Sequence, residues 1–180
     1  MRLALIAAVA MLAACSRPKD LPVMGQVPQF TLTAESGEAF DSKSLDGHVW
    51  VANFVFTHCT GPCPTMSRQM RQIQAQSQTV RLVSFSVDPA NDTPAALAAY
   101  ASNFKPDPSR WRFLTGDQAL LNEIALKAFK LNSVDGSLTH STRFALVDRK
   151  RQIRGYYVST DDGFMTQIMH DIRQLEREKS

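Results

Sequence analysis

The stretch "VWVANFVFTHCTGPCPTM" at residues 49–66 decides the fold class. Its first eight residues are apolar on both faces and rich in β-branched and aromatic side chains, as in a central, fully buried strand. A helix is expected next, because Pro64 suits a helix start and Met66 and Met70 follow at a spacing typical of core packing. A buried strand that leads directly into a helix indicates an α/β domain.

The remainder of the chain continues this alternation and predicts a mixed central β-sheet flanked by helices. Residues before the central strand alternate around a Ser-Gly turn and predict a small N-terminal β-hairpin, and a second hairpin is expected near the C-terminus. These elements are expected at residues 30–40 (hairpin), 80–87 (buried strand), 88–104 (helix with Asp92 or Thr93 as its N-cap), 110–116 (strand), 117–129 (helix), 143–157 (antiparallel hairpin) and 163–178 (helix).

The N-terminus reads as an export signal. Its apolar run at residues 3–14 is too short for a membrane-spanning helix and fits a signal-peptide core followed by small residues. "LAAC", ending at Cys15, resembles a bacterial lipobox, although an ordinary signal with an incidental cysteine is the alternative. We therefore expect a signal peptide at residues 1–14, a lipid anchor and tether at 15–28, and one domain at 29–180. The domain would be exported and held on a bacterial membrane, facing the periplasm, with the choice of membrane open.

Composition supports one globular domain and argues against nucleic-acid binding. The chain has 180 residues, of which 44% are hydrophobic, enough for a core of its own. The net charge is only +3, and the basic residues are scattered. No basic patch of the kind that binds phosphate backbones is visible in the sequence.

Two cysteines remain if Cys15 carries lipid. Cys59 follows the central strand, at the edge where α/β sheets build their sites. Cys63 lies at or just before a helix N-terminus, where backbone N–H groups stabilise a thiolate. A disulfide over so short a loop adds little stability, so the pair is expected to do chemistry. A redox couple and a clamp for a soft metal both fit this spacing.

The histidines help to choose between these uses, because two thiolates with one imidazole are a recognised copper ligand set. His48 and His170 are expected at the surface, and His58 adjoins Cys59 but would point to the other face of the chain. His140 lies in a loop just before a strand. It can reach the cysteines only if that strand runs antiparallel to the central one.

Three motifs resemble the Sco/SenC copper proteins. "FVFTHCTGPCPTM" resembles their C-x-x-x-C-P motif, "FSVDPANDTPAALAAYA" is similar to V-D-P-x-x-D-T-P, and "LTHSTRFALVD" resembles H-S-x-x-x-x-L-x-D. The likeness covers nearly the whole chain after the tether. It implies a thioredoxin-like fold and copper, as Cu(I), Cu(II) or both, bound by Cys59, Cys63 and His140. It also implies delivery of copper to, or thiol reduction of, the dinuclear copper centre in cytochrome c oxidase subunit II.

Several points qualify this resemblance. The residues between the cysteines are Thr-Gly-Pro, where family members often carry an acidic residue. Asp88 fits either a role in tuning the site or that of a turn residue.

A metallochaperone is not an enzyme in the strict sense. The alternative is an extracytoplasmic thiol–disulfide oxidoreductase that uses the Cys59/Cys63 pair. A second copper chaperone or a thiol reductant would be a further partner.

Overall fold

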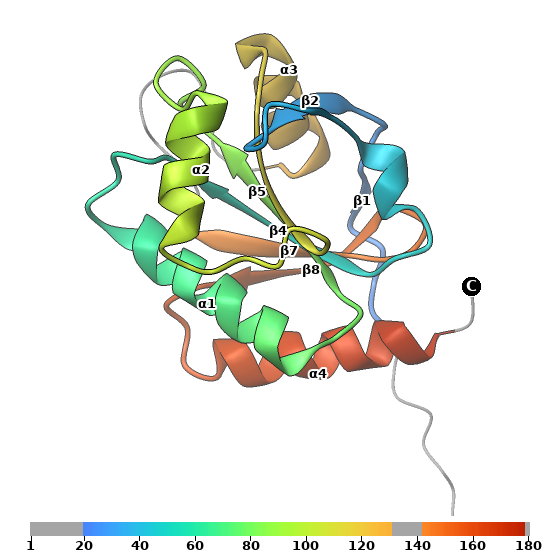
Figure 1. Ribbon diagram of the computed structural model, residues 1–180. Coiled ribbons are helices and arrows are strands. Elements are labelled where there is room, and N and C mark those ends of the chain that lie inside the picture. Colours follow the sequence, from blue (N-terminus) through green and yellow to red (C-terminus); the bar gives the residue numbers. More distant parts are fainter. Residues whose placement is uncertain (1–19, 131–141, 179–180) are drawn as a thin grey trace, which may run out of the picture.

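The computed structural model describes residues 20–130 and 142–178 (Figure 1). Its strands are β1 (Gly25–Gln26), β2 (Thr31–Ala34), β3 (Ala39–Asp41), β4 (Trp50–Val55), β5 (Arg81–Ser86), β6 (Trp111–Thr115), β7 (Arg143–Val147) and β8 (Gln152–Val158). Its helices are α1 (Pro62–Gln76), α2 (Pro94–Ser102), α3 (Gln118–Glu123) and α4 (Phe164–Arg177), with a 3₁₀ helix η1 (Ser42–Leu45) and a π-helical turn η2 (Ile124–Ala128).

The strands form one mixed sheet in the order β1-β8-β7-β4-β5-β6-β2-β3. The three strands β4, β5 and β6 are parallel, and every other pairing is antiparallel. The predicted α/β class, with a mixed sheet, flanking helices and an N-terminal β2–β3 hairpin, is confirmed. Within the described residues, no helix is long and apolar enough to cross a membrane.

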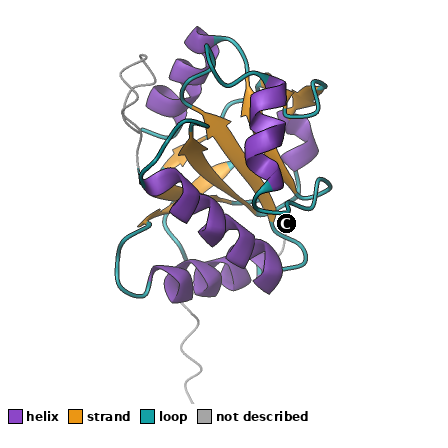
Figure 2. Cartoon of the chain, turned by 60° about the vertical axis from the view of Figure 1, so that its left-hand side comes forward, coloured by secondary structure: helices purple, strands orange, loops and turns teal. Residues whose placement is uncertain are grey.

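Strand β4 is central because both of its faces are covered. All six of its residues are buried, and alternate side chains enter two separate cores. Helices α1, α2 and α4 line one core, with α1 and α4 side by side (Figure 2). The β2–β3 hairpin, α3 and η2 line the other. The predicted core role of Met66 and Met70 is confirmed, since both are fully buried in the first core.

Two boundaries differ from the sequence-based expectation. The sheet begins with Gly25 and Gln26, which pair with β8, although residues 15–28 were assigned to the tether. Val27 is also buried, so the part of that segment nearest the domain belongs to the fold. The single helix expected at 117–129 is instead the short helix α3 followed directly by the π-helical turn η2. Turns of this kind are rare and depend on tertiary packing, which no local sequence signal reveals.

The N-cap of α2 gives a first testable prediction. The Thr93 side chain accepts a hydrogen bond from the backbone N–H of Ala96 at 3.2 Å. Replacing Thr93 by Ala leaves that N–H without its cap and is expected to lower the free energy of unfolding by about 1 kcal/mol, measured by urea denaturation. Thr93→Ser keeps the hydroxyl and should lose much less. Equal losses in the two variants would contradict the capping role.

Candidate metal centre

The topology brings three strand ends to one edge of the sheet. Strands β4 and β5 run parallel and both end there. Strand β7 is antiparallel to β4, with Trp50 opposite Val147 and Ala52 opposite Ala145, so β7 begins where β4 ends. The predicted antiparallel relation is therefore confirmed. His140 lies three residues before β7 and, like Cys15, falls outside the described residues.

The two cysteines lie together at this edge, in dithiol form. The Cys59 N–H donates to the Phe56 carbonyl at 3.2 Å, which folds the loop back after β4. The Cys63 N–H then donates to Cys59 Sγ at 3.4 Å. Helix α1 begins at Pro62, two residues earlier than expected, so Cys63 is in its first turn and one N-terminal N–H of the helix points at the neighbouring sulfur.

Burial has the largest effect on the pKa of the Cys63 thiol. Cys63 is fully buried, whereas Cys59 keeps 8% of its surface exposed. Desolvation raises the pKa of Cys63 well above its ordinary value, and the hydrogen bond with Cys59 raises it further. The helix terminus was expected to stabilise a thiolate here, but burial outweighs it. A bound metal ion would displace this proton, because a coordinating thiol is deprotonated.

The structure groups His58 with two carboxylates. Its ring is exposed, and Nδ1 lies 3.2 Å from the Thr57 hydroxyl. Among the described residues, one group of three metal-binding side chains has its ligand atoms within 4.8 Å of one another, and it consists of His58, Asp88 and Asp92.

Asp88 has the turn role, which was one of the two roles predicted for it. Its backbone carbonyl accepts from the N–H groups of Asn91 and Asp92, so it closes the turn after β5. The residue is only 8% exposed, and its carboxylate lies in the group with His58. Sequence reasoning gave Asp92 only a helix-capping role, which Thr93 performs instead. The V-D-P-x-x-D-T-P spacing, with two acids four residues apart, is the signal that could have indicated it.

Asp92 links the loops that follow β4 and β5. Its carboxylate accepts from the Thr57 N–H at 3.0 Å, from the Thr57 hydroxyl at 2.6 Å and from the Ser86 hydroxyl at 2.6 Å. Thr57 lies two residues before Cys59. The side chain is fully buried, so these bonds fix the start of the cysteine loop against β5.

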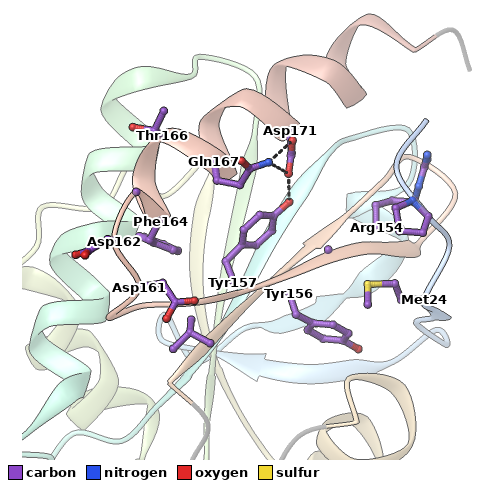
Figure 3. A pocket seen from close by; sticks show the side chains of 14 residues that line it. Met24, Arg154, Tyr156, Tyr157, Asp161, Asp162, Phe164, Thr166, Gln167 and Asp171 are labelled. Atoms are coloured by element: carbon purple, nitrogen blue, oxygen red, sulfur yellow. Dashed lines mark hydrogen bonds between the residues drawn. The ribbon is translucent and has the colours of Figure 1, made fainter. Parts of the chain in front are cut away.

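A groove of about 680 Å³ lies elsewhere, between β8 and α4 (Figure 3). Neither cysteine lines it. Two of its polar side chains bind a neighbouring carboxylate, because the Tyr157 hydroxyl donates to Asp171 at 2.7 Å and the Gln167 amide donates to the same group at 3.0 Å. The described part of the chain thus places its thiol chemistry at the strand ends and not in this groove.

The remaining histidines lie where the sequence predicted. His48 precedes β4, at the opposite end from Cys59, and is partly exposed. Burial and then the nearby Arg81 and Arg149 lower its pKa. His170 is exposed on α4, with Nδ1 2.9 Å from Asp171. Neither is placed to join the cysteine pair.

Comparison with known proteins decides the family, since the SCO1/SenC family model matches residues 22–176. The chain belongs to the SCO1/SenC family. The predicted membership is confirmed, and the match begins inside the segment that had been assigned to the tether. A curated relative, the SCO1 protein homolog of Bacillus subtilis (strain 168), is 35% identical over 161 residues, covering 84% of this chain and 83% of the relative.

Two solved structures of this Sco family add detail. BsSco, described as a member of the Sco family of cytochrome c oxidase assembly proteins in which a disulfide switch was identified, is 31% identical with a TM-score of 0.76, covering 89% of this chain and 98% of that one. ScoI of Bradyrhizobium japonicum, solved with copper bound, is 27% identical with a TM-score of 0.65, covering 83% and 99%. The thioredoxin-like fold expected from the motifs is thereby confirmed.

Proposed function

We propose that this Sco protein binds copper and delivers it to, or prepares the thiols of, the dinuclear copper centre in cytochrome c oxidase subunit II. The observation that carries the proposal is the pair Cys59 and Cys63 at the sheet edge where β7 also begins. Copper-bound ScoI supports the metal, and the description of BsSco supports the link to the oxidase.

The ligand set proposed for copper is Cys59, Cys63 and His140. Two soft thiolates and one imidazole suit both oxidation states of copper. Cys63 Sγ and Cys59 Sγ are close because a helix N–H of one residue contacts the sulfur of the other. The topology supports the third ligand, since β7 begins at Arg143, three positions after His140 in the sequence, at the edge where β4 ends.

Removal of His140 tests this ligand set. The reduced wild-type chain is expected to bind one Cu(I) ion, and His140→Ala should weaken Cu(I) binding at least about tenfold, because even outer-sphere partners of metal ligands contribute 10–100-fold. Affinity is measured by titration against a copper-chelating competitor, with metal spectroscopy of the bound form. His48→Ala, at the opposite end of β4, is the matched control. Unchanged affinity in His140→Ala would refute the role of this residue.

A second candidate function is thiol–disulfide exchange. The same contact between Cys63 and Cys59 permits a disulfide, and the disulfide switch in BsSco favours this reading. Reduction of an oxidised subunit II copper domain distinguishes the two functions. A pure reductase keeps that activity in His140→Ala, whereas a metallochaperone loses copper in the same variant.

We also propose that Cys15 carries lipid and holds the domain on the periplasmic side of a bacterial membrane. The support is the apolar run that ends in "LAAC". Mass spectrometry of the chain expressed in a bacterium tests it. An N-terminal diacylglyceryl cysteine is expected, and Cys15→Ser should release the domain from the membrane fraction.

A further inference from the structure

Two buried carboxylates lie beside the cysteine loop, and the described part of the chain pairs neither of them with a lysine or arginine. Asp92 is fully buried and Asp88 is 8% exposed. Neither forms an ion pair with a lysine or arginine within the described ranges 20–130 and 142–178. Burying a carboxylate is costly unless the charge is paired or binds a metal ion. Two such groups in one place therefore call for a cation.

The hydrogen bonds that these carboxylates accept leave some of their oxygen lone pairs available for a cation. A carboxylate offers about four acceptor positions. Asp92 uses three of them, for the Thr57 N–H, the Thr57 hydroxyl and the Ser86 hydroxyl. Asp88 uses two, both for the Asn91 amide at 2.9 and 3.1 Å. Each carboxylate therefore keeps oxygen lone pairs that can bind a further ligand.

His58 places a ring nitrogen near the two carboxylates. The described structure contains one side-chain contact of its ring, between Nδ1 and the Thr57 hydroxyl. The ligand atoms of His58, Asp88 and Asp92 all lie within 4.8 Å of one another. A metal ion about 2.1 Å from each ligand requires ligand atoms no more than about 4.2 Å apart. Ligand atoms within 4.8 Å of one another are near this limit, and the exposed His58 ring has room to move toward the carboxylates.

We propose that His58, Asp88 and Asp92 form a second metal site, distinct from the thiol pair, that takes a divalent transition-metal ion. Its donors are one imidazole and two carboxylates, which suit Cu²⁺ and Zn²⁺. The affinity order of first-row ions places Cu²⁺ first. The site at Cys59 and Cys63 has a different kind of donor, because thiolates are soft ligands that select Cu(I). Two sites with donors of different softness thus lie at one edge of the sheet.

The test separates this site from the thiol site by removing the latter. In a Cys59→Ser/Cys63→Ser/His140→Ala background, one equivalent of Cu²⁺ is expected to bind. Its electron paramagnetic resonance spectrum should show one coordinated nitrogen and no sulfur. Adding His58→Ala should remove the nitrogen signal, and adding Asp88→Asn should weaken binding about tenfold or more. The controls His170→Ala and Asp162→Asn, at exposed positions on or near α4, should bind as the background does.

A second arm needs no substitution at the thiols. The chain with Cys59 and Cys63 oxidised to a disulfide has no thiolate to offer, and Zn²⁺ titration of this form should give one site that depends on His58. The proposal fails if the folded background binds no Cu²⁺. It also fails if binding is the same with and without His58 and Asp88, which would show an adventitious ion only. Since the thiol ligands are absent in both arms, failure here would leave the proposed copper site at the cysteines unaffected.

Discussion

Replacing Cys63 by serine is expected to abolish tight copper binding. The substitution removes one of two thiolates, and a serine hydroxyl is a hard, neutral donor that cannot replace a soft sulfur. Because the loss of an outer partner already costs 10–100-fold in affinity, loss of a ligand should cost at least about 100-fold. Competition titration of the reduced chain with Cu(I) measures it. Cys59→Ser is expected to give a loss of similar size.

The control for this prediction is stability. Serine is nearly the size of cysteine, so the fold should persist, as circular dichroism can verify. Ser67→Ala, one helical turn further along α1, is a comparable buried polar change that should leave copper affinity unchanged. If Cys63→Ser retained wild-type affinity in a folded chain, the thiol pair would not be the copper site.

Replacing Phe85 by alanine should produce the largest loss of stability. Phe85 is fully buried on β5, beside Phe54 of β4. Its ring centroid lies 5.2–5.8 Å from those of Phe30, Phe54 and Phe129. Truncating such a side chain leaves a cavity and removes aromatic pair contacts, and typically costs about 3–5 kcal/mol. That is a large share of the roughly 5–15 kcal/mol by which a domain is stable.

Urea denaturation with fluorescence and circular dichroism measures this effect. Phe85→Leu keeps most of the volume and should cost clearly less, about 1.5 kcal/mol. A loss below 1 kcal/mol in Phe85→Ala would show that the surrounding core collapses into the space. Phe85 also belongs to the core that contains Cys59 and Cys63, so a weakened copper affinity in the same variant would follow from loosened packing beneath the loop.

The elements that could be predicted are those whose signal is local. The run at 49–56 is apolar on both faces, and this alone identifies β4 as central. Helix α2 has its cap and first-turn proline in sequence, at Thr93 and Pro94. The start of the sheet at Gly25 was missed because two residues paired to β8 leave no alternating pattern. The π-helical turn was missed for a similar reason, since packing around Ile124 and Phe129 is not local.

At the site, residue identity was predictable but environment was not. The spacing of Cys59 and Cys63 and the required direction of β7 came from sequence alone. The pKa of Cys63 did not, because the helix N-terminus is visible in the sequence while the depth of burial is not. Asp92 was similarly misread as a cap. Its carboxylate instead accepts hydrogen bonds from Thr57, 35 residues away; the V-D-P-x-x-D-T-P spacing pairs Asp92 with Asp88 but does not reveal this contact.

The unequal exposure of the two sulfurs sets the order of events in any exchange with a partner. In the proposed thiol–disulfide exchange, an incoming thiolate is expected to attack Cys59, the less enclosed of the two, with Cys63 as the leaving group. A thiol whose pKa is raised by burial leaves slowly. Once oxidised, the pair therefore resists small thiols for a long time. It reopens fastest with a reductant that engages the loop and relaxes the packing around Cys63.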